Sequence, residues 1–369
     1  MLQKAAIAAA SLSAALAWLV STAPGEPEWI HNPPPASANK KNNADQVRFV
    51  GGDGSTWLTG HFYPPTTSGQ DDNVNVDVED DSSPKTTPSP VVVLSVGLGL
   101  TQDCSLEPFV DAFTSAGFAA LTFDYATFGA SDGLPRHQVN PDRHIADLQA
   151  AITMLQQNAK DLNIDPTKLG LWGASLGGGH SLMVASSQDL SIRAVAVLVP
   201  HVGSAVEIIS GEIMARPMVM LPGLLQVLHG TLKWAIMALV YQKPWYLPLH
   251  GPPGSAALMQ NPGDDEGYAS LLPATNEYGW RNAATAGSGL KLMAYVPMKS
   301  VSKISSPTLL IAAEQDTLTP ASEVVKASKL IPNADLLVIP GAGHFDVFHD
   351  ELLEQVLATT VEFYQKQLN

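Results

Sequence analysis

The stretch that decides the fold is LGLWGASLGGGHSL, residues Leu169 to Leu182. An apolar run ending at Trp172 leads into Gly173-Ala174-Ser175-Leu176-Gly177, and a helical stretch follows at once. This is a G-x-S-x-G pattern between a predicted strand and a predicted helix. Such a tight turn lifts the serine hydroxyl above a sheet, at the positive end of the next helix. The pattern predicts Ser175 as a nucleophile, and a chance glycine turn is the alternative.

The segments on both sides predict a parallel sheet. Apolar strands at 90–97, 118–125 and 168–173 alternate with amphipathic helical segments, and the same rhythm returns after residue 306 and ends in a helix from Val347. Continuous apolar strands separated by helices indicate a sheet that is covered on both faces. We therefore expect an α/β fold with a mostly parallel central sheet, opened by two antiparallel strands around the turn at 51–54.

The domain organisation follows from changes in composition. Residues 1–23 contain a short apolar run typical of a signal peptide or N-terminal anchor, and residues 24–45 form a predicted linker. The domain is expected over 46–369. Within it, 66–90 is a predicted disordered acidic insertion, and 201–300, rich in Met, Trp, Leu and Pro, is a predicted helical cap over an apolar cavity. The alternative for the cap is an ordinary helical subdomain with its own core.

Charge limits the partners. The chain carries 35 acidic and 20 basic residues, a formal net charge of −15, which disfavours nucleic acid and anionic lipid. A membrane contact is expected only through the N-terminal segment. That segment predicts the secretory pathway, with an extracellular or membrane-anchored product, and a cytoplasmic protein is the alternative. The single cysteine, Cys104, excludes an intramolecular disulfide.

A serine nucleophile needs a histidine base and a group that orients the histidine. His344 follows the predicted strand ADLLVIP in a glycine-rich loop, and Asp316 follows the predicted strand TLLIAA. The order Ser, Asp, His along the chain favours Asp316 over its rivals Glu314 and Asp124. Asp346 is too close to His344 in the chain to orient it. His201 and His250 border the cap and are either substrate contacts or structural residues.

The oxyanion of an acyl-transfer intermediate needs two backbone donors. One is expected from the residue after the serine, Leu176, and the other from the loop after the first parallel strand, where Leu98 is favoured. Cys104, on the same loop, is expected to be a bystander.

Six segments together resemble one known superfamily. They are LSVGLGLTQDC, FDYATFGASDG, GLWGASLGGGH, GPPGS, AAEQDTLTP and PGAGHFDVF. The chain is similar, from about Gln46 to Leu368, to the α/β hydrolases of the serine-aminopeptidase-like and dienelactone-hydrolase-like branch. Two positions depart from that pattern, because Val96 stands where a histidine is usual and Ala126 where an arginine is common.

These observations predict a serine hydrolase that cleaves an ester or thioester of a hydrophobic small molecule through an acyl-enzyme at Ser175. No cofactor or metal is expected. A serine peptidase or an acyltransferase could use the same triad, and a non-catalytic binding protein is an alternative of another class. A dehalogenase or epoxide hydrolase would need a carboxylate in place of Ser175.

Overall fold

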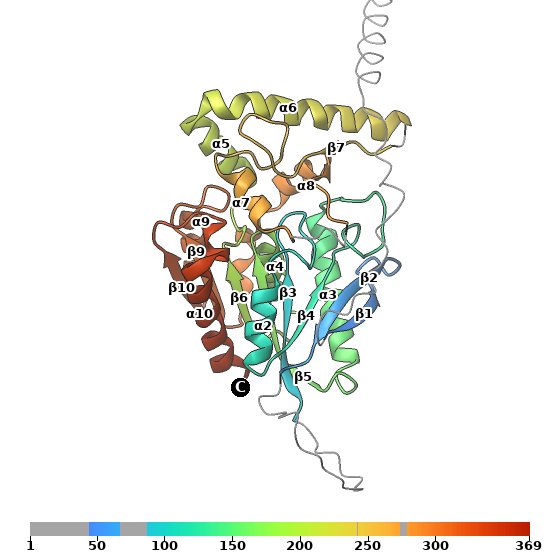
Figure 1. Ribbon diagram of the computed structural model, residues 1–369, viewed down its shortest axis with the longest axis vertical. Coiled ribbons are helices and arrows are strands. Elements are labelled where there is room, and N and C mark those ends of the chain that lie inside the picture. Colours follow the sequence, from blue (N-terminus) through green and yellow to red (C-terminus); the bar gives the residue numbers. More distant parts are fainter. Residues whose placement is uncertain (1–43, 67–86, 242, 274–278) are drawn as a thin grey trace, which may run out of the picture.

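The structure, a computed structural model, describes residues 44–66, 87–241, 243–273 and 279–369. The predicted leader and almost all of the predicted linker and acidic insertion lie outside these residues. At the centre is an eight-stranded sheet of order β1-β2-β4-β3-β5-β6-β9-β10 (Figure 1). Its strands are β1 (Asp45–Val50), β2 (Trp57–Tyr63), β3 (Ser89–Ser95), β4 (Ala119–Phe123), β5 (Ile164–Ala174), β6 (Ala194–Leu198), β9 (Thr308–Ala313) and β10 (Ala334–Ile339).

The pairing of the strands confirms the predicted fold class. Strand β2 pairs antiparallel with both β1 and β4, whereas every pair from β4 to β10 is parallel. The inner strands β3, β4, β6 and β9 are buried almost throughout, as their unbroken apolar sequences predict for a sheet covered on both faces. All parallel strands therefore end at one edge of the sheet, where functional residues of open α/β sheets gather.

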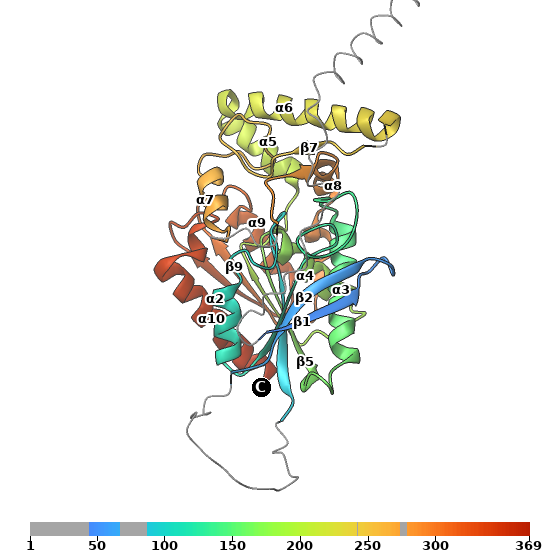
Figure 2. The ribbon, with the colours of Figure 1, turned by 45° about the vertical axis from the view of Figure 1, so that its right-hand side comes forward.

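Helices cover both faces of the sheet (Figure 2). On one face α2 (Glu107–Ser115) packs against α10 (Asp350–Leu368), and on the other α3 (Pro141–Gln157) packs against α4 (Leu176–Ser187). The helix α9 (Ala321–Leu330) packs against β9 and β10. The terminal helix was predicted from Val347 but begins at Asp350. A short 3-10 turn, Asp346–Phe348, comes first and continues the loop that holds His344.

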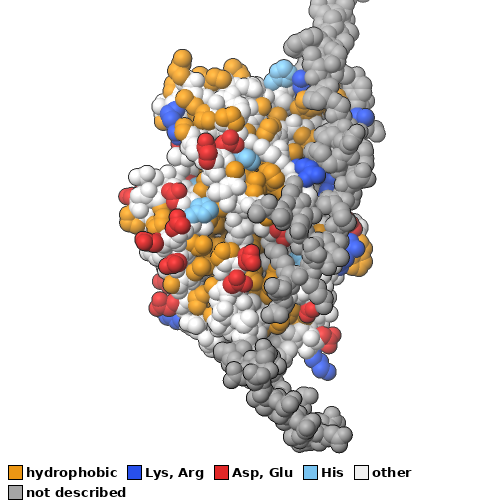
Figure 3. Space-filling view, viewed as in Figure 1, with side chains coloured by type: hydrophobic (Ala, Val, Ile, Leu, Met, Phe, Trp, Pro, Cys, Tyr) orange, Lys and Arg blue, Asp and Glu red, His pale blue; other side chains and the backbone are white. Residues whose placement is uncertain are grey.

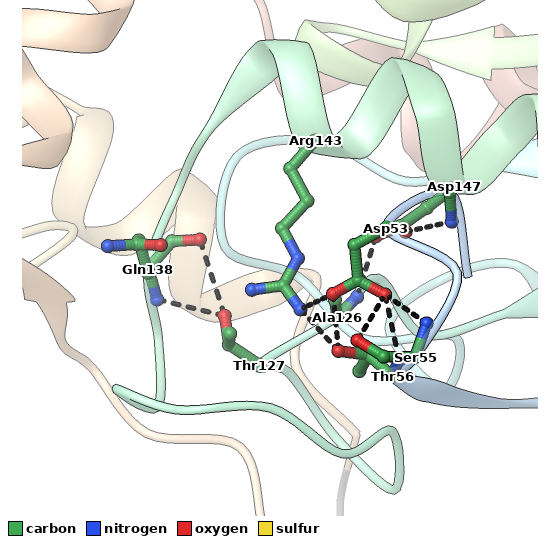
Figure 4. A network of polar contacts seen from close by, with 9 residues as sticks. Asp53, Ser55, Thr56, Ala126, Thr127, Gln138, Arg143 and Asp147 are labelled. Carbon is green, nitrogen blue, oxygen red and sulfur yellow. Dashed lines mark hydrogen bonds and ion pairs between the residues drawn. The ribbon is translucent and has the colours of Figure 1, made fainter. Parts of the chain in front are cut away.

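A polar network ties the β1–β2 turn to α3 (Figure 4). Asp53 accepts hydrogen bonds from the Thr56 amide at 2.7 Å and from Arg143 at 2.8 Å, and Asp147 accepts one from the Gly52 amide at 3.1 Å. Burial alone would raise the pKa of Asp53, but the hydrogen bonds from Thr56 and the charge of Arg143 outweigh it and lower that pKa well below its usual range. Burial raises the pKa of Asp147 to about 6.

The segment between β6 and β9 leaves the sheet and lies above the carboxyl ends of the strands (Figure 1). Its helices are α5 (Ala205–Ala215), α6 (Pro217–Ile236), the π-helical turn η2 (Met237–Tyr241), α7 (Asp264–Ser270), α8 (Ser288–Ala294) and the 3-10 turns η3 (Pro297–Lys299) and η4 (Val301–Lys303). Two short strands, β7 (Tyr246–Leu247) and β8 (Ala284–Thr285), pair with each other. In the described ranges, no helix combines the length and the apolar character that a bilayer crossing requires.

Candidate active site

Ser175 occupies a strained turn between β5 and α4. Its backbone angles, φ 52° and ψ −120°, lie in a region that residues with a side chain rarely adopt, and its amide donates to the Leu198 carbonyl at 2.9 Å. The turn also needs a close approach of α4 to β3, since a Cβ added to Gly177 would lie 2.3 Å from the Ser95 carbonyl oxygen. The sequence pattern predicted this geometry.

Asp316 and His344 follow the adjacent strands β9 and β10 and meet at the same edge of the sheet. Nδ1 of His344 lies 2.7 Å from Oδ2 of Asp316, and both side chains are buried. The Asp316 carboxylate also accepts hydrogen bonds from the amides of Leu318 at 2.8 Å and Thr319 at 2.7 Å. A carboxylate fixed in this way favours the tautomer of His344 with its proton on Nδ1 and leaves Nε2 as the nitrogen that can accept a proton.

Two cavities meet at Ser175. The smaller, of about 30 Å³, is lined by Ser175 and His344 together with apolar side chains. The larger, of about 250 Å³, extends from Ser175 beneath α5, α6 and α8. Leu98 and Met259 line both cavities with the serine. Ser175 therefore stands where a reacting carbonyl could lie with its large substituent in the larger cavity, while the smaller cavity admits only a water-sized group.

The rival acids have structural partners of their own. Glu314 accepts a hydrogen bond from the Gly341 amide and Asp346 accepts one from the Gly343 amide, so both shape the loop that carries His344. Asp124 lies in the interior, where it accepts the Gln102 amide at 2.9 Å and where burial raises its pKa. Asp316 is the carboxylate that the structure places against His344.

The predicted oxyanion donors flank the serine. Leu176 is the first residue of α4, and Leu98 lies in the loop after β3. That loop approaches Ser175 closely, since a Cβ added to Gly97 would lie 3.5 Å from the Ser175 Cβ. Both leucines line the larger cavity.

The cap holds the loop after β3 that carries Leu98, a feature that sequence reasoning missed. The Tyr268 hydroxyl donates to the Leu98 carbonyl at 2.7 Å, and Nε1 of Trp280 donates to the Gly99 carbonyl at 3.1 Å. The ring of His250 stacks on Tyr268, with centroids 4.6 Å apart. These contacts fix the loop from the side of the cap, two and three residues after Val96. No sequence pattern signals them, because the donors are more than 160 residues from the carbonyls.

The two cap-border histidines have different surroundings. Nδ1 of His250 lies 2.7 Å from Oδ1 of Asp265, so this ring belongs to the cluster that supports the loop. His201 lines the larger cavity, and its amide donates to the Ser175 carbonyl at 2.9 Å. Burial lowers the pKa of His201, which keeps its ring neutral at physiological pH.

Cys104 is a bystander at the site, as its environment indicates, and no metal cluster lies near it in the described ranges. Cys104 lines the smaller cavity and lies 3.3 Å from the Thr101 hydroxyl, and burial raises the pKa of its thiol to about 11. Across the described ranges, no three His, Cys, Asp or Glu side chains come together as a metal site would require.

Comparison with known proteins places this site in a family. A family model described as "Serine aminopeptidase, S33" matches residues 86–351. The quorum-quenching protein AidA of Acinetobacter baumannii is 30% identical over 278 residues, which cover 75% of this chain and 86% of that protein. The polyketide transferase af380 of Aspergillus fumigatus is 25% identical over 332 residues, which cover 89% and 99% of the two chains.

A solved structure agrees with the fold. The complex of DcsB with its substrate analogue superposes with a TM-score of 0.69 at 22% identity, and the match covers 88% of this chain and 99% of DcsB. The match at this identity concerns the fold alone, whereas the family model extends from just before β3 to the start of α10. The chain therefore belongs to the serine aminopeptidase S33 family of α/β hydrolases.

Proposed function

We propose that the protein is a serine hydrolase that cleaves a carboxylic ester or thioester of a hydrophobic small molecule. Ser175 attacks the acyl carbon while Nε2 of His344 takes the hydroxyl proton. The leaving alcohol or thiol departs with that proton. Water then attacks the acyl-enzyme, with His344 acting again as base, and releases the acid and free Ser175. Asp316 stabilises the imidazolium that forms in each half of the cycle.

One observation carries this proposal. The strained serine and His344 line one cavity, and His344 is held by a buried carboxylate at 2.7 Å. A histidine oriented in this way is what a serine hydroxyl needs to become a nucleophile near neutral pH. The amides of Leu98 and Leu176 are the proposed donors to the oxyanion, in a loop and a helix start that other contacts fix in advance.

The larger cavity supports a hydrophobic substrate. Most of its lining is aliphatic, and the carboxylate that lines it, Glu212, is paired with Arg216. An aminopeptidase would need an anionic group to receive the free α-amino group of its substrate, and a carboxylate already neutralised by Arg216 is poorly suited to that task. We therefore favour ester or thioester cleavage over peptide cleavage, although the name of the family model includes aminopeptidase.

Acyl transfer is the second candidate. The larger cavity at Ser175 offers room for an acyl group or for an organic acceptor, whereas the smaller one, of about 30 Å³, admits only water-sized groups. A relative of nearly the same length is named a polyketide transferase. The same acyl-enzyme would form in both reactions, and only the nucleophile of the second half-reaction would differ.

Covalent labelling tests the nucleophile directly. The purified protein is treated with a fluorophosphonate probe beside Ser175→Ala and the matched variant Ser181→Ala, whose serine is buried on α4 away from both cavities. Wild type and Ser181→Ala should label, and Ser175→Ala should not. A folded wild-type protein that fails to label would instead favour a binding role. Product analysis of an alkyl ester, with and without added alcohol, separates hydrolysis from transfer.

A further inference from the structure

The outer surface of the cap is unusually apolar. Eleven of the sixteen large apolar residues that are exposed in the described ranges belong to the cap. Five of them, Met218, Leu221, Leu225, Leu228 and Leu232, form a continuous stripe along α6, and Figure 3 shows apolar side chains along the upper edge where α6 lies in Figure 1. Met218 is 88% exposed and Leu225 is 64% exposed. Apolar patches of this kind mark interaction sites.

The helix α6 presents two apolar faces. Met220, Leu224 and Val227 line the larger cavity, as does Leu228 at the edge of the exposed stripe, whereas Met218, Leu221, Leu225 and Leu232 are exposed and do not line it. A surface helix of a globular protein ordinarily has a polar outer face. The face with Met220, Leu224 and Val227 is apolar because it lines the cavity. The exposed stripe lines no cavity along most of its length, so its apolar character calls for a partner outside the domain.

The charge of this region differs from that of the rest of the chain. Residues 213–263 contain no Asp or Glu, although the chain holds 35, and they include Arg216, Lys233 and Lys243. The net charge of −15 is therefore carried elsewhere. The neighbouring helix α5 carries Glu207 and Glu212, and Glu212 is paired with Arg216, so the part of the surface without carboxylates is α6 and the chain that follows it, where Lys233 and Lys243 supply positive charge. This part can approach phospholipid headgroups, which the molecule's average charge would disfavour.

The larger cavity reaches the same surface. Ile209, Leu228, Leu290 and Met293 line the cavity and are also among the exposed apolar residues. A bilayer against this face would bring lipid-dissolved molecules to that opening. A second copy of the chain packed along α6 would cover the residues at the mouth instead, which makes self-association the poorer explanation.

We infer that α6 and the exposed side chains around it form a docking surface for the headgroup region of a phospholipid bilayer. The helix lies in the plane of the membrane, with Met218, Leu221, Leu225 and Leu232 entering the boundary between headgroups and acyl chains. This surface is distinct from the predicted N-terminal anchor, and it does not depend on the chemistry proposed for Ser175.

A site-specific probe separates docking by α6 from any binding by the N-terminal segment. A polarity-sensitive thiol dye is attached to Met218→Cys in the full-length chain and, as a matched control, to Leu330→Cys on α9. The native Cys104 is buried, so it does not compete for the dye. With vesicles of phosphatidylcholine containing a quarter phosphatidylglycerol, the emission at position 218 should shift to the blue, and the emission at position 330 should not change. No shift at position 218 would overturn the inference.

A second comparison tests the energetic contribution of the stripe. Leu225→Ser with Leu232→Ser should weaken the binding of the full-length chain to the same vesicles by roughly tenfold. The matched pair Leu330→Ser with Leu336→Ser should bind as wild type does. Turnover of a water-soluble short-chain ester should be unchanged in both. Light scattering reports whether the wild-type chain dimerises. If it forms a dimer that the double variant Leu225→Ser with Leu232→Ser does not form, and the dye at position 218 does not respond to vesicles, the surface serves self-association and the inference fails.

Discussion

Asp316 offers the sharpest test of the site at the scale of one residue. Its carboxylate accepts two backbone amides and lies against Nδ1 of His344. Asp316→Asn keeps the size of the side chain but can present an amide N–H to Nδ1, which favours the wrong tautomer of the histidine. We expect kcat to fall by about 10³ to 10⁴ while the protein stays folded. Steady-state kinetics with a nitrophenyl ester measure this change.

Asp346→Asn is the matched control. Asp346 is only two residues from His344, but its carboxylate accepts the Gly343 amide and is not placed against the imidazole. We expect kcat to fall by less than about tenfold, through a small shift of the loop. Equal losses in the two variants would contradict the assignment of Asp316 as the orienting group.

The placement of these residues could be predicted because each is attached to a strong local signal. Ser175, Asp316 and His344 all follow an apolar strand, and parallel strands end at one edge of the sheet. Tyr268 and Trp280 could not be predicted in the same way. Their polar atoms reach backbone carbonyls across the interface between cap and sheet, and neither periodicity nor local composition records such a contact.

At the scale of elements, the contact between the cap and the oxyanion loop predicts a kinetic effect. Tyr268→Phe removes the hydroxyl that donates to the Leu98 carbonyl and leaves the ring stacked on His250. The loop should lose part of its fixed orientation, so we expect kcat to fall about tenfold while KM changes little, because the oxyanion forms only after binding. The two constants are measured with one nitrophenyl ester.

Tyr364→Phe separates positioning from stability. The Tyr364 hydroxyl is also buried and also donates to a backbone carbonyl, that of Leu171. Tyr364 lies on α10, however, which covers a face of the sheet and does not belong to the cap. Each variant should lose about 1 kcal/mol of unfolding free energy. Only Tyr268→Phe should lower kcat. If both variants keep wild-type kcat, the loop does not need the cap to hold it.

The packing of α4 against β3 predicts an effect on stability. In Gly177→Ala the new methyl group would meet the carbonyl oxygens of Ser95 and Val96 at 2.3 and 2.4 Å, and backbone atoms cannot move aside as a flexible side chain can. We expect a loss of about 3 kcal/mol in the free energy of unfolding, measured in urea. Gly211→Ala is the control, because nothing lies within 4 Å of its added Cβ on α5. It should be neutral or stabilising by about 0.5 kcal/mol.

The elements themselves could be predicted to different degrees. The strands and helices of the sheet domain carry regular apolar patterns, and most of them lie where the sequence predicts. The main difference is at the last helix, which begins at Asp350 and not at Val347, because a 3-10 turn precedes it. The helix α6 is apolar on more than one side, so periodicity could not say which of its faces would be buried. That choice depends on the cavity and on the surroundings of α6 rather than on local pattern.

At the scale of the whole molecule, the net charge does not show how unevenly the acidic residues are distributed along the chain. The net charge of −15 predicted no attraction to lipid, and yet residues 213–263 contain no acidic side chain. A mean over 369 residues cannot show this, because the fold decides which residues share a surface. The number of histidines is equally uninformative about their surroundings. Several imidazoles are buried in the sheet domain among apolar and aromatic side chains.

These buried histidines predict how stability depends on pH. Burial lowers the pKa of His137 and of His144 to about 3, and it lowers the pKa of His180 and of His201 as well. In the unfolded chain each should take up a proton near pH 6.5. Because the unfolded state then binds more protons, the free energy of unfolding must fall as the pH drops below about 6.5.

Three buried carboxyl groups oppose this trend without reversing it. Burial raises the pKa of Asp147 and of Asp264 to about 6, and it raises the pKa of Asp124 as well, so the folded state takes up their protons above the usual aspartate value near 3.8. That uptake stabilises the fold on acidification, but three carboxyl groups act against four histidines, each of which takes up its proton in the unfolded chain near pH 6.5. We expect urea unfolding to give a free energy lower by on the order of 3 kcal/mol at pH 5.5 than at pH 7.5, with an unchanged m-value. A free energy that stays level or rises over this range would mean that the imidazoles are not held neutral in the fold, and that polar groups or water reach His137, His144, His180 and His201.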